Sequence, residues 1–269
     1  MLAVQATNTD PFILQLRSFD ANGSGEVTNF NADSSYTWTI SLAASGLFGF
    51  AAGKFTFDTS TFQNDLAGGY FSVGTNANAL TVSFTNNHPP STTTWFFYQG
   101  PNGVAIPLTN LATHWSDVDG DPVILEDVNT TSANGVPVSF DSRFIYYSGT
   151  STVADTLTYT VQDVRTNPPA VYRPGDTQRT ANGNVILLPR PFLGRPAISG
   201  SNLVCGVSGG IPGGTFAVLT STNLTEPLNQ WQPLSTNTFD TNGHFVIVTP
   251  LPGTPHRFLR VQTMGGGAF

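Results

Sequence analysis

Apolar residues alternate with polar ones in short runs along the whole chain. Each run is bounded by Gly, Asn, Asp or Pro, and nowhere do apolar residues recur at helical spacing over three turns. Asn242-Gly243 is the clearest hairpin turn among the breaks. The pattern predicts an all-β fold of tandem antiparallel β-sandwich modules with almost no helix. The runs that we interpret as strands are 12–16, 36–40, 54–57, 70–73, 79–84, 94–97, 144–147, 157–161, 184–188, 202–205, 216–219, 231–234, 245–248 and 257–261.

Two proline-containing segments interrupt this pattern, at 86–90 and at 189–196. Proline has no backbone N–H to donate to a ladder, and it restricts the residue before it, so both segments are typical of stiff connectors. A β-sandwich module has about 100 residues, and the chain has 269. We therefore predict three modules, at 1–86, 87–190 and 191–269.

The composition excludes several classes of partner and site. Charged residues make up 10% of the chain, Lys54 is its one lysine, and the net charge is -7. Nucleic acids and anionic membranes need clustered Lys and Arg, so we expect neither as a partner. Cys205 is the single cysteine, which excludes an intrachain disulfide and any site of paired thiolates.

No feature of the sequence indicates membrane insertion or an export signal. Apolar stretches stay far below the roughly 20 residues that span a bilayer, and residues 1–6 lack a positive start and an apolar core. We expect a piece of a longer secreted or cell-surface polypeptide whose export signal lies elsewhere, although a cytoplasmic protein would look the same in this respect. The oligomeric state stays open.

The segment Ser116-Asp117-Val118-Asp119-Gly120-Asp121-Pro122 carries three carboxylates at alternate positions around a glycine. Alternation places the three side chains on one side of an extended strand end, and glycine allows the tight turn that lets their oxygens converge on a hard cation. The alternative is a solvated β-turn. We favour calcium, because a turn does not need three carboxylates that repel one another.

The loop does not match an EF-hand. Counted from Asp117, its glycine is fourth rather than sixth, and Val128 stands at position twelve in place of a bidentate Glu. Further ligands must come from elsewhere, and the nearest candidates are Asp163 and Glu126. The predicted calcium ligands are Asp117, Asp119, Asp121 and Asp163.

Residues 206–210 match the nucleophile-elbow pattern around Ser208, followed by Asp240, His244 and His256 in hydrolase order. An elbow needs a helix directly after the serine, and Ile-Pro-Gly-Gly-Thr at 211–215 does not start one. We therefore interpret this segment as a Gly-rich hairpin and predict no catalytic residue.

The tryptophans allow two interpretations. Trp38, Trp95, Trp115 and Trp231 could form a sugar-stacking face, but one or two tryptophans are what the core of each module requires, and we favour the core. Trp115 is the exception, because it stands beside the aspartate loop, where an aromatic ring and a cation could make a small ligand site.

Three segments of the middle module match a known pattern: Asn-His-Pro-Pro at 87–90, the aspartate loop, and Leu-Thr-Tyr-Thr-Val-Gln-Asp at 157–163. With these, the module resembles the cadherin-like and bacterial Ig-like repeats of large surface adhesins. The resemblance implies a Greek-key sandwich, calcium held by Asp117, Asp119 and Asp121, and use as a spacer or adhesive link. The insertion at 165–180 is longer than such repeats carry, and a long loop is where a new function could lie.

The flanking modules have weaker resemblances. Through 36–40, 49–50, 53–55 and 66–69, the first looks like the carboxy-terminal portion of bacterial autotransporter-associated surface proteins. Through 219–224, Trp231 and 237–240, the third is similar to small Ig-like or fibronectin-like modules of secreted bacterial proteins. Neither family contributes a catalytic residue.

The resulting interpretation is a non-catalytic extracellular module for adhesion or spacing, stiffened by Ca²⁺, with other protein modules or surface glycans as partners. One alternative is a calcium-assisted hydrolase of a lactone, ester or glycoside, with a pocket between the aspartate loop and the 165–180 insertion. A second alternative is a carbohydrate-binding module, which needs exposed coplanar aromatic side chains.

Overall fold

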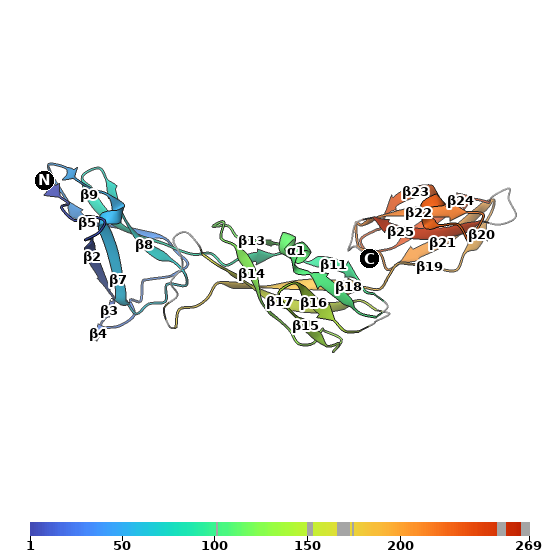
Figure 1. Ribbon diagram of the computed structural model, residues 1–269, viewed down its shortest axis with the longest axis horizontal. Helices are drawn as coiled ribbons and strands as arrows, with labels where there is room; N and C mark the ends of the chain where they lie inside the picture. The colour runs from blue at the N-terminus through green and yellow to red at the C-terminus, as the bar shows by residue number, and fades with distance from the viewer. Residues whose placement is uncertain (101, 150–152, 166–172, 174, 252–256, 265–269) are drawn as a thin grey trace. The chain divides into compact units, whose positions relative to one another are not determined.

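The computed structural model describes residues 1–100, 102–149, 153–165, 173, 175–251 and 257–264. The chain divides into two compact units, and Figure 1 labels the helices and strands that are described below. Unit 1 consists of Met1–Ser91, Trp115–Glu126 and Val161–Ala181, and unit 2 of Thr92–His114, Asp127–Thr160 and Asn182–Phe269.

The amino-terminal part of unit 1 is built from short strands. An antiparallel sheet has the order β5-β9-β8, while β1 pairs with β6 and β2 with β7 in parallel, and β3 and β4 form a small antiparallel pair. The bounds are β1 (Leu2–Ala3), β2 (Phe12–Arg17), β3 (Phe19–Asp20), β4 (Gly23–Ser24), β5 (Tyr36–Leu42), β6 (Leu47–Phe48), η1 (Ala52–Lys54), β7 (Phe55–Thr61), β8 (Tyr70–Asn76) and β9 (Ala79–Thr85).

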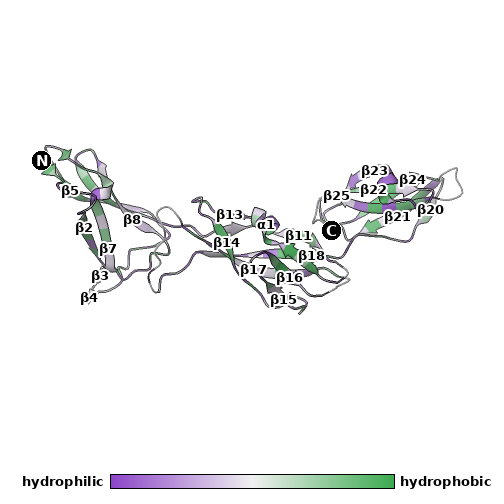
Figure 2. Ribbon diagram, viewed as in Figure 1, coloured by the Kyte–Doolittle hydropathy of each residue, from purple (hydrophilic) through white to green (hydrophobic). Residues whose placement is uncertain are grey.

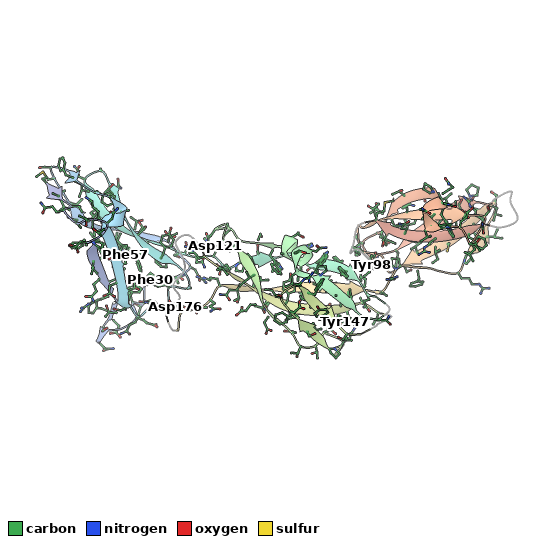
Figure 3. The ribbon with its side chains drawn as sticks, in the orientation of Figure 1. Phe30, Phe57, Tyr98, Asp121, Tyr147 and Asp176 are labelled. Carbon is green, nitrogen blue, oxygen red and sulfur yellow. The ribbon has the colours of Figure 1, made fainter. Side chains whose placement is uncertain are left out.

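Aromatic rings fill the interior of this region. Phe84 is 1% exposed, and the ring centroids of Phe30 and Phe71 lie 4.9 and 5.1 Å from its own. Phe62 packs edge-on against Phe30 at 5.1 Å. Tilted and edge-to-face pairs at these separations add to the free energy gained by burying the rings, and Figure 3 labels Phe30 within this cluster.

A four-stranded sheet with the order β11-β18-β17-β14 follows. Side chains of β17 alternate between buried and half-buried along the whole strand, with Leu157, Tyr159 and Val161 at most 1% exposed. Figure 2 shows apolar residues concentrated in β11 and β18. The bounds are β11 (Trp95–Tyr98), β14 (Val123–Val128), β17 (Asp155–Asp163) and β18 (Thr180–Leu188).

Two further elements of this region are a three-stranded antiparallel sheet, β12-β16-β15, and a short pairing of β10 with β13. Ile106 of β12 and Ile145 of β16 pair directly and are fully buried. The bounds are β10 (Ser91–Thr92), β12 (Val104–Pro107), α1 (Leu108–Leu111), η2 (Ala112–His114), β13 (Trp115–Ser116), β15 (Val138–Phe140) and β16 (Phe144–Tyr147).

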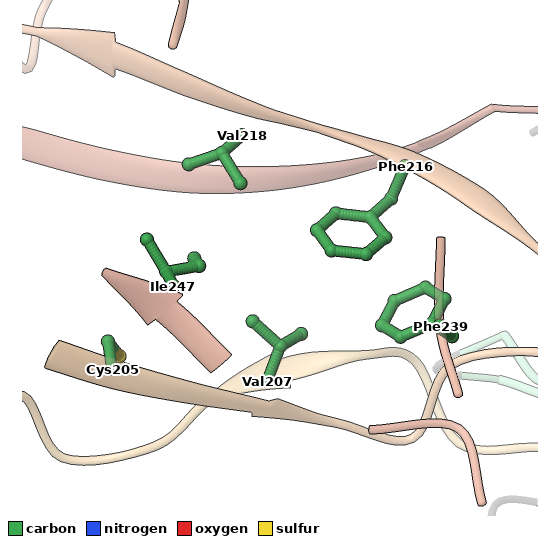
Figure 4. Close-up of a cluster of buried hydrophobic side chains, with 6 residues drawn as sticks. All are labelled: Cys205, Val207, Phe216, Val218, Phe239 and Ile247. Atoms are coloured by element: carbon green, nitrogen blue, oxygen red, sulfur yellow. The ribbon is translucent and has the colours of Figure 1, made fainter. Parts of the chain in front are cut away.

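The carboxy-terminal part of unit 2 contains two sheets that share one core. Strand β21 pairs with β19, β20 and β24, and β22 lies between β23 and β25. Side chains of both sheets meet in one buried cluster (Figure 4), formed by Cys205, Val207, Phe216, Val218, Phe239 and Ile247. The bounds are β19 (Phe192–Leu193), β20 (Ala197–Ser199), β21 (Asn202–Ser208), β22 (Thr215–Ser221), η3 (Leu228–Gln230), β23 (Gln232–Thr238), β24 (Phe245–Pro250) and β25 (Phe258–Met264).

The hairpin prediction at Asn242-Gly243 is wrong. A turn is present, with Gly243 at φ +72, and the Asp240 carboxylate accepts hydrogen bonds from the N–H groups of Asn242 and His244. However, β23 pairs with β22 whereas β24 pairs with β21, so the turn connects two sheets. Turn chemistry specifies the local bend and not the partner of the strand that follows it.

The all-β prediction is confirmed. The helical segments of the described residues are the four-residue α1 and three 3₁₀ turns of three residues each. None of the described helices has the length and apolar character to cross a bilayer. The parallel pairs β1–β6, β2–β7 and β11–β18 depart from the expected antiparallel pairing. The sandwich arrangement and the three module boundaries stay predictions.

Candidate metal centre

The aspartate loop connects β13 to β14. Asp117 directly follows β13 and organises the turn, because its Oδ1 accepts hydrogen bonds from the N–H groups of Asp119 at 2.8 Å and Asp121 at 3.3 Å. Gly120 has a φ of +80, a backbone conformation that strains any residue with a Cβ. One carboxylate oxygen from each of Asp117, Asp119 and Asp121 lies within 4.8 Å of the other two.

Asp119 is held by the segment that precedes β10. Its Oδ2 accepts a hydrogen bond from the backbone N–H of His88 at 2.8 Å, and its Oδ1 lies 3.0 Å from His88 Nδ1. Burial acts to raise the pKa of Asp119, but the hydrogen bonds from the His88 backbone and ring, with the charge of Arg165, hold that pKa below its usual value. Asp119 is therefore ionised at neutral pH.

Asp163, the last residue of β17, is fully buried. Its Oδ2 accepts a hydrogen bond from Asn87 Nδ2 at 2.7 Å. Burial raises the pKa of Asp163; the Asn87 hydrogen bond opposes this effect, and repulsion from Asp117 and Asp121 adds to it. Burial is thus the main cause of the raised pKa of Asp163, and the charge of Arg165 opposes the repulsion from the two neighbouring aspartates.

Several buried atoms of the site have no hydrogen-bond partner among the described residues. They are Asp117 Oδ2, Asp121 Oδ2, Asp163 Oδ1 and Arg165 Nε. Asp121 is labelled in Figure 3, and its side chain is 9% exposed. An unpaired buried carboxylate oxygen is costly, and three in one site are what a cation would satisfy.

The predicted ligands are thus partly brought together. Asp117, Asp119 and Asp121 form the cluster, and Asp163 is near enough for its pKa to respond to two of them. Glu126 is exposed on β14 and is not part of the cluster. Which of these residues would hold a metal stays a prediction.

Comparisons of the chain with family models, with curated proteins and with solved structures found no match. The resemblances drawn from sequence motifs therefore stay predictions, and the case for function depends on the geometry of this site.

Sequence analysis missed three residues of the site: Asn87, His88 and Arg165. The first two stand in the segment interpreted as a connector and as part of the cadherin-like resemblance, and Arg165 begins the insertion. The sequence carries no spacing signal for them, because His88 and Arg165 lie 31 and 46 positions from Asp119.

The described residues of the 165–180 insertion contact other segments of unit 1. Arg173 donates hydrogen bonds to the carbonyls of Thr59, Phe62 and Asn64, and its guanidinium pairs with Asp176 at 3.0 Å. Arg179 pairs with Asp33 at 2.6 Å. This part of the insertion, which includes Asp176 in Figure 3, therefore fastens the chain to the region of residues 33–64. Residues 166–172 and 174 lie outside the described residues.

The elbow segment has a strand conformation at its serine. Ser208 is the last residue of β21 and pairs with Phe192, and Gly209 has a φ of +83 at the bend that follows. No helix begins at this bend, which the structure describes fully. The strand–helix junction of a nucleophile elbow is therefore not formed at Ser208. His256 lies outside the described residues.

Proposed function

We propose that the aspartate loop and Asp163 bind calcium, and that the protein is a non-catalytic extracellular module for adhesion or spacing that calcium stiffens. The observation that carries the proposal is a set of buried carboxylate oxygens without a hydrogen-bond partner among the described residues: Asp117 Oδ2, Asp121 Oδ2 and Asp163 Oδ1. Asp163 has no exposed surface at all, so water cannot take the place of a partner freely.

The donor set favours a hard cation. The four carboxylates contribute four negative charges against the one positive charge of Arg165, and all the unpaired acceptors are oxygens. Calcium takes six to eight oxygen ligands at about 2.3–2.6 Å in a flexible geometry, so carboxylates from separate segments can surround it. Magnesium requires a near-octahedral shell at about 2.0–2.1 Å and gives up water reluctantly, which fits this site less well.

Calcium would connect parts of the chain that are distant in sequence. The site draws on residues 87–88, 117–121 and 163–165, so one ion would stabilise all three segments at once. Such a connection suits a spacer or an adhesive link, whose segments have to resist extension. Secretion or a cell-surface location belongs to the same proposal, because weak calcium sites are loaded where calcium is millimolar.

The test is calcium titration of protein freed of metal with a chelator. Isothermal titration should show binding, and saturating calcium should raise the melting temperature by several degrees, since a ligand at a hundred times its Kd contributes about 2.7 kcal/mol. Asp121→Asn should weaken binding roughly tenfold or more, because it removes one ligand charge. No binding heat, together with equal melting curves in calcium and chelator, would overturn the proposal.

A matched control is Asp141→Asn. Asp141 also accepts hydrogen bonds in a turn, from the N–H groups of Arg143 and Phe144, but it does not belong to the acidic cluster. Its calcium response should equal that of the unsubstituted protein. Hydrolysis of an ester, lactone or glycoside panel that chelator abolishes would instead support the hydrolase alternative.

A second candidate function, carbohydrate binding, has one observation in its favour. Trp38 is 41% exposed and stacks on Tyr36 with ring centroids 5.3 Å apart and an interplanar angle of 18°. Both rings line a cavity of about 200 Å³ with Phe30, Phe62 and Asn29. Flat aromatic faces beside an uncharged amide suit the apolar face of a sugar ring.

Trp231 does not share this role, because it is 8% exposed and its Nε1 donates a hydrogen bond to the carbonyl of Glu226. Affinity electrophoresis in gels that contain soluble polysaccharides would test the candidate. Trp38→Ala should abolish any retardation, and Phe12→Ala, which removes another exposed ring, should not. Equal mobility of the unsubstituted protein and Trp38→Ala in every gel would contradict it.

A further inference from the structure

Arg165 brings a positive charge into the acidic site. Its side chain is 5% exposed, and its Nη2 donates a hydrogen bond to Asn87 Oδ1 at 2.7 Å. The same nitrogen lies 3.5 Å from Asp119 Oδ2, and Nε lies 3.3 Å from Asp121 Oδ2. The guanidinium carbon is 5.2 Å from the centre of the Tyr70 ring, at cation–π distance.

The contact between Arg165 and Asp121 is an ion pair without a hydrogen bond. Although the two atoms are 3.3 Å apart, neither Arg165 Nε nor Asp121 Oδ2 has a hydrogen-bond partner among the described residues. The charges attract each other, but the guanidinium does not make the bidentate contact that strengthens an Arg–carboxylate pair. A stronger cation can therefore replace it at Asp121.

Calcium and the guanidinium would need the same oxygens. An ion about 2.4 Å from Asp121 Oδ2 would lie within about 5.7 Å of a guanidinium nitrogen that is itself 3.3 Å from that oxygen, and the two cations would repel each other. Arginine cannot relieve this repulsion by losing its proton, because the guanidinium is always charged in proteins. Binding of the ion must instead displace the side chain or weaken its contacts.

We propose that Arg165 is the internal counter-ion of the metal-free site and competes with calcium for Asp119 and Asp121. This inference rests on the proposed calcium binding and deepens it. Without calcium, the guanidinium partly neutralises the carboxylates and keeps the segments of the site together. With calcium, its displacement costs free energy, so Arg165 lowers the affinity and narrows the difference in stability between the metal-free and loaded forms.

The experiment compares calcium titrations of the full chain and of Arg165→Gln by calorimetry, with melting curves in chelator and in calcium. Gln keeps amide donors for Asn87 but removes the charge. We expect Arg165→Gln to bind calcium roughly tenfold more tightly or better and to melt several degrees lower in chelator. Arg165→Lys retains the charge, and its affinity should stay within about threefold of that of the unsubstituted protein.

Arg179→Gln is the matched control, because Arg179 belongs to the same insertion and pairs with Asp33 rather than with the acidic cluster. Its calcium affinity should be unchanged. Should Arg165→Gln unfold in chelator, recovery of its far-ultraviolet circular dichroism in low calcium would support the inference.

The possible failures are distinguishable. Equal or weaker calcium binding by folded Arg165→Gln would overturn the counter-ion role and leave calcium binding intact. A gain in calcium affinity in Arg165→Lys as large as that in Arg165→Gln would also overturn the counter-ion role, because the loss of the positive charge would then not be the cause of the gain. An absence of calcium binding in every variant would overturn both the inference and the proposed function.

Discussion

Two buried aspartates of this chain differ in how their oxygens are used. Asp155 is 3% exposed, and its carboxylate accepts four hydrogen bonds, from the hydroxyls of Ser132 at 2.5 Å and Tyr147 at 2.8 Å, and from the N–H groups of Asn134 at 3.0 Å and Thr156 at 2.7 Å. Asp163 is fully buried, and its Oδ1 has no partner among the described residues.

The number of hydrogen bonds that each carboxylate accepts distinguishes Asp155 from Asp163. Burial acts to raise the pKa of Asp155, but its hydrogen bonds lower the pKa overall, whereas the pKa of Asp163 is raised by burial and by repulsion from its neighbours. A carboxylate with all its acceptor positions used holds the fold together. A buried carboxylate oxygen without a hydrogen-bond partner, such as Asp163 Oδ1, is the kind of group that a ligand could satisfy.

We expect Asp155→Ala to change the free energy of unfolding more than any other substitution that we propose. The substitution leaves two buried hydroxyls and two N–H groups without their acceptor, so the free energy of unfolding should fall by about 4 kcal/mol, equally in calcium and in chelator. Urea denaturation followed by circular dichroism measures it. Asp141→Ala, at an exposed turn carboxylate, should lower the free energy of unfolding far less. Equal losses in the two variants would mean that burial does not distinguish these carboxylates.

The same comparison applies to two arginines. Arg173 donates to three backbone carbonyls and pairs with Asp176, whereas Arg165 Nε has no hydrogen-bond partner among the described residues. We expect Arg173→Ala to lower the free energy of unfolding by about 2 kcal/mol, because the carbonyls lose a charged donor. Limited proteolysis should become faster near residues 59–64. An unchanged unfolding curve would contradict the fastening role of the insertion.

Tyr147→Phe should have a smaller, pH-dependent effect. The substitution removes the hydroxyl donor to Asp155 and should cost about 1.5 kcal/mol near neutral pH. Burial, with the Asp155 hydrogen bond and charge, raises the pKa of Tyr147 from 10.0 to about 12. A raised pKa contributes stability that is complete below the unfolded value of 10.0 and is lost as the pH rises through about 12. Denaturation series between pH 8 and pH 12 should therefore show that the two proteins become more alike in their free energy of unfolding above pH 10. A difference in this free energy that stays constant over the range would contradict the prediction.

The fold class follows from the sequence because strand alternation is a local signal. Leu157, Tyr159 and Val161 show it directly, since every second side chain of β17 is buried. The turn at Gly120 can likewise be predicted from the local sequence, because glycine is the residue that adopts a positive φ without strain. Strand pairing is not local, which is why the turn at 242–243 was predicted as a hairpin although it connects two sheets.

The acidic loop could be predicted, but the groups that surround it could not. Asp119 is held by His88 from 31 positions away, and Arg165 reaches Asn87 across 78 positions. No spacing rule relates such residues, because the fold alone brings them together. The groups that offset or hold the negative charge of the loop can therefore be identified only from the structure.

The smallest expected effect is also the sharpest test of the contrast between Asp155 and Asp163. Asp163→Asn removes a charge that Asp117 and Asp121 repel, and the new amide can donate towards their unpaired oxygens. In chelator, we expect the free energy of unfolding to rise by about 1 kcal/mol, the opposite sign to Asp155→Ala. In calcium the gain should vanish or reverse, because the ion would lose one of its ligand charges.

Paired urea titrations at pH 7, in chelator and in calcium, measure the change in the free energy of unfolding under both conditions. Repeating the chelator series at pH 4 adds a control. A carboxylate with a raised pKa loses its repulsive charge on protonation, so the advantage of Asp163→Asn should shrink as the pH falls through the raised pKa. If Asp163→Asn instead destabilises the metal-free protein as Asp155→Ala does, then Asp163 is a structural carboxylate like Asp155, and the spare oxygen does not identify a ligand site.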